Sequence, residues 1–450
     1  MTTSAAAPVP APTPAAPAAA PRGVPTLATP GGPVAVGGPS ARTGWRARLG
    51  RTPGRLVLAG VGAVVACLVA GGVGLAAGIS QSQALSDAAA DAGQLVGVQE
   101  VRNDLVAADA TLTNAFLVGG LEPAQMRVQY DESVDAAAQG LAQRAGGNAR
   151  DAHALGTVTS DLTVYTGLVE QARANNRQGF PVGAAYLDQA STELREQMLP
   201  VLDDVVDANA GRVSSSFGAV DRAAWLVLVV LVAVGALVWV QVWLARRTHR
   251  RLNRGLVTAT VLVLVSLAAS AVVLGGAASA AHATRDVPYQ DTLDVSQAYA
   301  LVNDARSMES FTLIKRGSGA AYEEQYQANV AQARTHLEQV RGATDGAALL
   351  DALEAWTTEH EAIRAADDGG DWDGAVALAT ATGPGTSSDA FAQFSGLARS
   401  RITADADQVA DELSGSGRSS VLVGWLALAV GVVAAAFAWR GLSVRLREYR

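Results

Sequence analysis

Four apolar stretches alternate with long polar stretches along the chain. Apart from arginines at their ends they contain no Asp, Glu, Lys, Arg or His. Each has roughly the twenty residues that an α-helix needs to cross a lipid bilayer. We therefore predict four transmembrane helices, at residues 55–79, 224–245, 255–279 and 420–440.

Arginines cluster before the first apolar stretch, between the second and the third, and after the fourth, whereas segments 80–223 and 280–419 hold more acidic than basic residues. Arginine in short loops stays on the cytoplasmic side of a membrane. We therefore expect a multi-pass protein of the cell membrane, with both termini and a basic hairpin at 246–254 in the cytoplasm. The hairpin supplies the candidate contacts for a cytoplasmic partner: Arg246, Arg247, Arg250, Arg251 and Arg254.

Segment 80–223 shows the periodicity of amphipathic helices, because its apolar residues recur every three or four positions. Glycines at 119–120, 146–147 and 179 separate three such stripes, and we expect a fourth helix to begin near Thr192. Four helices with short links form an antiparallel four-helix bundle. The stripes begin with Leu95, Val98 and Val101, with Met126, Tyr130 and Val134, and with Leu155, Val158 and Leu162.

Segment 280–419 repeats this pattern. Val295, Ala298 and Leu301 follow the first stripe at an offset of about 200 residues, and the offset is the same between Trp225 and Trp425 in the apolar stretches. The sequence thus predicts an all-α polytopic membrane protein with four transmembrane helices and two extracellular antiparallel four-helix bundles in tandem repeat. The C-terminal tail, residues 441–450, is expected in the cytoplasm.

Residues 1–54 are rich in Pro and Ala and become basic towards their end. Such a composition cannot bury enough apolar surface to fold, so we interpret this segment as a disordered cytoplasmic tail. A cleaved signal peptide is the competing interpretation. Against it, the tail is longer than the segment that precedes a signal-peptide core, and the apolar stretch after the tail is longer than a typical core.

Candidate chemistry is sparse in this chain of 450 residues, which has a formal net charge of −8. The basic residues flank the membrane helices and are not spread over a folded face, which argues against a nucleic-acid partner. The single cysteine allows no intramolecular disulfide. The histidines lack metal-ligand spacing, and we interpret acidic pairs such as Glu323–Glu324 as solvated surface. We therefore expect no enzymatic activity, no metal and no cofactor.

His360 departs from the repeat, because the first copy has Val169 at the matching position of its apolar stripe. A histidine at such a position is commonly a hydrogen-bonded core residue. The alternative is a pH- or ligand-responsive group, and we take His360 as the candidate switch position. The ligand-binding residues themselves are not evident from the sequence.

No proline or linker separates the first apolar stretch from the helix that follows it. Such a helix can form one rod from the outer tip to the cytoplasm and can transmit a change of packing across the membrane. The alternatives are a passive stalk, a cell-envelope scaffold or a transporter accessory protein. Small residues at Gly74 and Gly78, and at Ala427, Gly431 and Ala435, are typical of close helix contacts in membranes.

The order of membrane helix, four-helix bundle and membrane helix resembles the extracellular input domains of bacterial chemoreceptors and sensor kinases. The Pro/Ala-rich tail, the hairpin beginning Arg246-Arg247 and the Arg-rich end also resemble the actinobacterial four-span membrane protein that links an amino-acid-binding lipoprotein to protein kinase G. This resemblance implies a sensor or signal relay with an extracellular solute-binding lipoprotein and a soluble cytoplasmic kinase as partners. A homodimer is a further expectation.

Overall fold

The computed structural model describes residues 52–119, 122–178, 181–222, 226–248, 253–341 and 343–447. Every regular element in these ranges is helical. In chain order the elements are α2 (Thr52–Val118), α3 (Ala124–Gly147), α4 (Ala152–Arg177), α5 (Val182–Glu193), the π-helix η1 (Leu194–Met198), α6 (Leu199–Arg222), α7 (Leu226–Thr248), α8 (Arg254–Thr284), the π-helix η3 (Arg285–Tyr289), α9 (Gln290–Ile314), α10 (Ala320–Gln339), α11 (Ala343–Asp368), α12 (Trp372–Thr380) and α13 (Ser387–Arg447).

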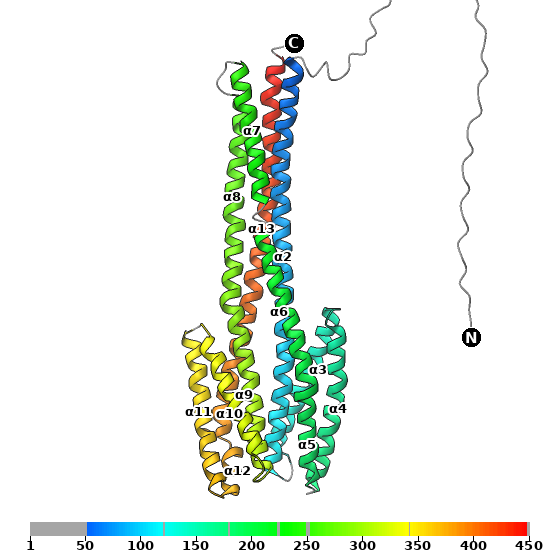
Figure 1. The fold of residues 1–450 in the computed structure, drawn as a ribbon, viewed down its shortest axis with the longest axis vertical. Helices are drawn as coiled ribbons and strands as arrows, with labels where there is room; N and C mark the ends of the chain where they lie inside the picture. Colours follow the sequence, from blue (N-terminus) through cyan, green and yellow to red (C-terminus); the bar gives the residue numbers. More distant parts are fainter. Residues whose placement is uncertain are drawn as a thin grey trace, which may run out of the picture. The chain divides into compact units, whose positions relative to one another are not determined.

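Four helical stretches are long and apolar enough to span a membrane, as the hydropathy pattern predicts. They belong to α2, α7, α8 and α13, and their apolar parts lie side by side at one end of the helices (Figure 1). The protein therefore has the architecture of a multi-pass membrane protein. Residues of the predicted tail up to 51, and the hairpin residues 249–252, lie outside the described ranges.

Two helices run unbroken from the apolar end to the opposite, distal end. Helix α2 has 67 residues and α13 has 61, and at 1.5 Å per residue α2 is about 100 Å long. A third rod consists of α8, η3 and α9. Pro288 lies inside η3, where the i→i+5 pattern accommodates a residue without an amide hydrogen. The prediction of a continuous rod is confirmed for α2, and α13 forms a second one.

Helices α2 and α13 pack directly against each other in the apolar region, where glycines allow their backbones to approach. A methyl group added at Gly78 would lie 2.9 Å from the Cα atom of Gly424, and one added at Gly431 would lie 2.8 Å from the Cα atom of Gly71. Both distances are shorter than a side-chain carbon tolerates. The two small-residue stripes seen in the sequence therefore face one another across this helix pair.

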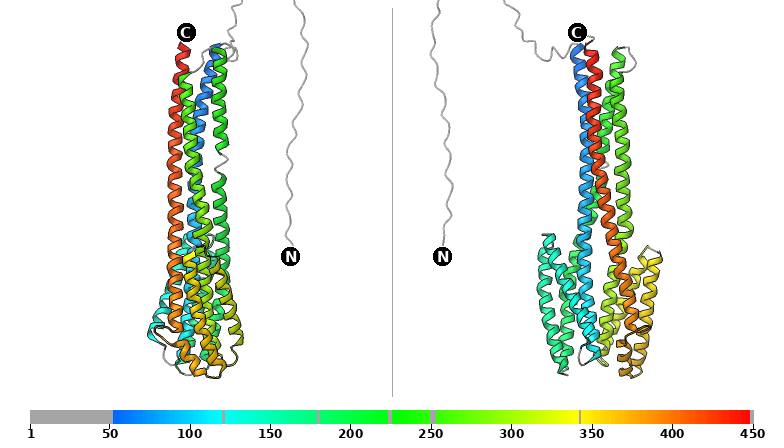
Figure 2. Two further views of the ribbon diagram at one scale, coloured as in Figure 1. Left: turned by 90° about the vertical axis from the view of Figure 1, so that its left-hand side faces the viewer. Right: turned by 180° about the vertical axis from the view of Figure 1, so that it is seen from behind.

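Away from the apolar end the helices form two groups (Figures 1 and 2). The first helix group consists of the distal part of α2 with α3, α4, α5 and α6, and the second consists of α9, α10, α11, α12 and the distal part of α13. Most residues of the expected stripes are buried: Leu95, Val98 and Leu155 have no exposed surface. Met126 and Val134 of the second stripe are only partly buried.

The two groups share one continuous apolar core, which the sequence did not predict. Its members extend from Ala84 in α2 through Leu141 in α3 to Leu413 in α13. A second correction concerns the fourth helix of the first group: it begins at Val182, directly after Pro181, and not near Thr192. Proline is favoured at a helix start because its fixed φ angle suits the first turn.

Candidate functional site

His360, the candidate switch, lies on α11 in the interior of the second helix group. Only 2 % of its surface is exposed, and its ring stacks on Tyr326 of α10 with the centroids 3.6 Å apart. Its Nδ1 atom lies 2.8 Å from Oε2 of Glu309 on α9, and its Nε2 atom lies 3.2 Å from Oε1 of Glu323 on α10. The histidine thus joins three helices.

Both ring nitrogens of His360 face carboxylate oxygens, which only accept hydrogen bonds, so the geometry favours the doubly protonated imidazolium. Burial by itself lowers the pKa of His360, but the hydrogen bonds to Glu309 and Glu323 outweigh it and raise this pKa above its ordinary value. Burial alone would raise the pKa of Glu323. Its hydrogen bond to His360 is the largest of several opposing effects, and together these lower the pKa of Glu323 below its usual range. The interpretation of Glu323 as solvated surface was therefore wrong.

Arg306 extends this cluster to the beginning of α13. Its Nη1 atom donates to Glu309 Oε1 at 2.6 Å and to Ser387 Oγ at 2.7 Å. Its Nη2 atom donates to the carbonyl oxygen of Ala379 and to Ser388 Oγ, both at 3.2 Å. Ala379 lies near the end of α12 and the two serines begin α13. A buried chain of polar contacts therefore leads from His360 to the first turn of the long α13 rod.

Asp109 of α2 is a buried acid of the first helix group, and it connects that group to the second. It accepts hydrogen bonds from Ser191 Oγ of α5 at 2.5 Å and from Ser307 Oγ of α9 at 2.6 Å. Lys315 and Asp188 form a further bridge between the groups, with Nζ and Oδ2 2.8 Å apart. These contacts fix the two groups to each other.

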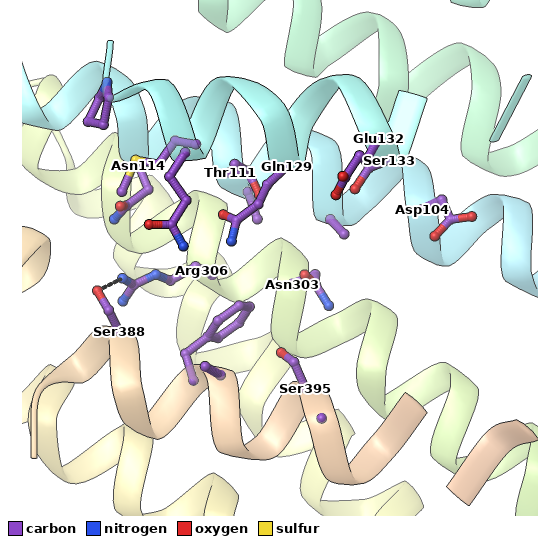
Figure 3. A pocket seen from close by; sticks show the side chains of 18 of the residues that line it. Asp104, Thr111, Asn114, Gln129, Glu132, Ser133, Asn303, Arg306, Ser388 and Ser395 are labelled. Atoms are coloured by element: carbon purple, nitrogen blue, oxygen red, sulfur yellow. Dashed lines mark hydrogen bonds between the residues drawn. The ribbon is translucent and has the colours of Figure 1, made fainter. Parts of the chain in front are cut away.

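Between α3 and α13 the groups leave a cleft of about 990 Å³, whose floor is formed by α2 and α9. Figure 3 shows Gln129 and Glu132 of α3 on one side of the opening, Ser388 and Ser395 of α13 on the other, and Arg306 and Asn303 of α9 between them. A smaller cleft of about 390 Å³ adjoins it. Both are lined by Asp104, Ala136, Tyr299 and Arg399, so together they form one groove.

Arg399 lies where the two clefts meet and bridges the groups at that point. It donates from Nη2 to Asp104 Oδ1 at 2.9 Å and from Nε to Tyr299 Oη at 3.0 Å. Burial raises the pKa of Asp104 to about 6, although the charge of Arg399 opposes this shift. Asp104 therefore titrates close to neutrality, and its bond to Arg399 is weakened by mild acid.

The proposed cytoplasmic contacts are described only in part. Arg246 at the end of α7 and Arg254 at the start of α8 are exposed, and Arg247 is within α7. Arg250 and Arg251 lie outside the described residues. Next to them, Asn253 Nδ2 donates to the carbonyl oxygen of Gly441 in α13 at 2.9 Å.

Sequence reasoning found His360 but missed Asp109, Arg306 and Glu309. All three are charged residues within buried helix faces, and Asp109 and Glu309 directly follow the stripe positions Ala108 and Met308. Charged residues on core-facing positions are rare unless they are paired, so this placement was the available signal. Within the described ranges, no group of three or more His, Cys, Asp or Glu side chains could hold a metal ion.

Comparison with curated proteins and with solved structures finds no match. A family model does match: residues 84–218, which include the distal part of α2 and the helices up to α6, fit the actinobacterial sensor domain. The first helix group is therefore similar to the sensor domains of actinobacterial proteins.

Proposed function

We propose that the protein is a non-enzymatic transmembrane sensor and signal relay. In this proposal the two helix groups are tandem extracellular four-helix bundles, which detect a ligand or a ligand-loaded binding protein. The membrane helices pass the resulting state to a separate cytoplasmic effector. The match of residues 84–218 to a sensor domain supports the sensing role.

The observation that carries the proposal is the continuity of α2 and α13. Each is a single helix from the distal end to the apolar end, and the two pack together along the apolar region with close approach at Gly71, Gly78 and Gly431. A helix is stiff along its axis, so a displacement at the distal end moves the other end as well. At the distal end, the first residue of α13 is hydrogen-bonded to Arg306, which belongs to the polar chain from His360. A partner bound there can change the position of α13.

The proposed partners are those that the sequence resemblance implies. Outside the membrane we propose a solute-binding lipoprotein, and inside we propose a soluble Ser/Thr kinase that contacts the basic hairpin at 246–254. The exposed side chains of Arg246 and Arg254 are consistent with such a contact. A homodimer remains part of the proposal.

Disulfide cross-linking in native membranes tests the relay and requires no added ligand. Gly60 of α2 lies against Leu442 of α13 near the cytoplasmic end, where a Cβ atom on Gly60 would be 3.4 Å from the leucine Cδ2. The reporter carries Cys67→Ala, Gly60→Cys and Leu442→Cys. We expect the distal substitution His360→Val to change the rate of cross-linking at this pair, whereas a passive scaffold predicts the same rate in both backgrounds.

Topology is tested separately with a membrane-impermeant maleimide in intact cells. In the Cys67→Ala background, Gln129→Cys should react from outside, whereas Ser443→Cys should react only after the membrane is permeabilised. Labelling of both positions from the same side would contradict the orientation.

A further inference from the structure

The groove between the helix groups has the shape of a site for a chain-like ligand. On α3 it is lined from Gln125 to Arg144 and on α13 from Ser388 to Thr403. In each helix the lining positions recur every three or four residues, so one face of each helix forms a wall. At 1.5 Å per residue the α3 wall is about 28 Å long, which exceeds the length of a single small metabolite.

The wall on α3 carries uncharged hydrogen-bonding groups that the fold leaves free. Gln125, Gln129, Gln139 and Gln143 are exposed and have no hydrogen bond to any described residue. Opposite them, the buried Oγ atom of Ser395 also has no partner among the described residues. Amides offer a donor and an acceptor side by side, which suits hydroxyl groups because each of these also donates and accepts.

The ionised groups of the groove that could attract a charged ligand are paired within the protein. Arg399 is bonded to Asp104, Arg144 lies 3.8 Å from Glu100, and Arg306 is bonded to Glu309. An anionic ligand would meet arginines whose charge is already balanced by a carboxylate, and a cationic ligand would find only Glu132 on the α3 wall without an ion pair among the described residues. An uncharged ligand leaves every pair intact.

Two aromatic side chains complete the lining. Phe391 of α13 is partly exposed on the side opposite α3, whereas Tyr299 of α9 contributes to the floor with 3 % of its surface exposed. The small residues Ala136 and Gly396 add little bulk to the two walls. Flat apolar surface next to planar amides suits a ligand that has both C–H faces and hydroxyl edges.

From these observations we propose that the groove binds an uncharged, polyhydroxylated chain, namely a short linear oligosaccharide. The proposal deepens the sensing role and rests on it for its biological meaning, because the ligand would bridge α3 and α13 and so change how the two helix groups meet. The chemistry of the groove favours this class over charged solutes.

Binding is tested with the full chain in lipid nanodiscs, by isothermal titration with cellotriose, maltotriose and chitotriose and on an array of neutral linear oligosaccharides of graded length. We expect at least one of these probes to bind. Ala136→Trp, which fills the point where the two clefts meet, should abolish the binding. Gln129→Ala removes about one hydrogen bond and should weaken it about threefold to tenfold.

Gln171→Ala on the exposed surface of α4 is the matched control and should bind like the wild type. If Ala136→Trp lowers the melting temperature, the double variant Gln129→Ala/Gln139→Ala serves instead, because neither glutamine has a side-chain hydrogen bond to lose among the described residues. Absence of binding across the whole array, binding that all these variants leave unchanged, or preferential binding of citrate or glutamate would each overturn the proposal. Sugar binding without any change at the Gly60–Leu442 reporter would instead count against the relay and leave the binding site standing.

Discussion

Replacing His360 by valine is the most direct test of the buried cluster, because valine is the residue at the matching position of the first helix group. The substitution removes the only imidazolium between Glu309 and Glu323. Glu309 has 1 % of its surface exposed and, among the described residues, keeps Arg306 as its cationic partner. Breaking a buried ion pair by removing one partner typically costs about 3–5 kcal/mol, since the remaining charge is desolvated without compensation.

Hydrogen exchange of the α10 and α11 amides, followed by mass spectrometry on the protein in nanodiscs, measures this loss locally. A cost of about 3–5 kcal/mol corresponds to roughly a hundredfold to several-thousandfold faster exchange through the local opening reaction. His336→Ala is the control. The Nδ1 atom of His336 is hydrogen-bonded to Asp294 at 3.1 Å and the side chain is partly exposed, so its removal should cost at most about 1 kcal/mol.

The structure also predicts how the difference in exchange between wild type and His360→Val changes with pH. Because the pKa of His360 is raised in the folded protein, its stabilising effect is complete below the ordinary value of 6.5 and is lost as the pH rises through the raised value. The difference between wild type and His360→Val should therefore be largest in mild acid and shrink in alkali. If the two proteins exchange equally at pH 6, or if the difference grows towards alkaline pH, the imidazolium assignment is wrong.

Three further results are expected. Asp109→Ala leaves the hydroxyl of Ser307 without its acceptor between the helix groups, so thermal melting should show a loss of about 1–3 kcal/mol, and an unchanged melting temperature would contradict the role of this acid. Gly78→Leu places a side chain against the backbone at Ser420, so cross-linking between α2 and α13 at the Gly60–Leu442 reporter should fall sharply. Gly72→Leu is the control, because its side chain meets open space and should leave the cross-linking intact. Asp104→Asn should remove a titration near pH 6 that is visible in the carboxylate infrared band of the wild type, and persistence of that step would assign it to another group.

Hydropathy and helical periodicity were sufficient to predict the membrane helices and the buried stripes, because both depend on the composition of single segments. His360 was identified for the same reason, as a polar residue on a core-facing position. Its partners were not, because Glu309 and Glu323 belong to other helices and periodicity does not say which helices face each other. The shared core and the groove were missed likewise, since both arise from the packing of the two helix groups.

The pairing of α2 with α13 also determines when folding can be completed during synthesis. These are the first and the last helices that the structure describes, and their backbones approach closely at the apolar end. During synthesis the contact face of α2 stays uncovered until α13 has left the ribosome and entered the bilayer, so this pairing closes the largest loop in the fold and comes late. A chain interrupted before residue 387 would expose that face to lipid and to membrane quality-control proteases.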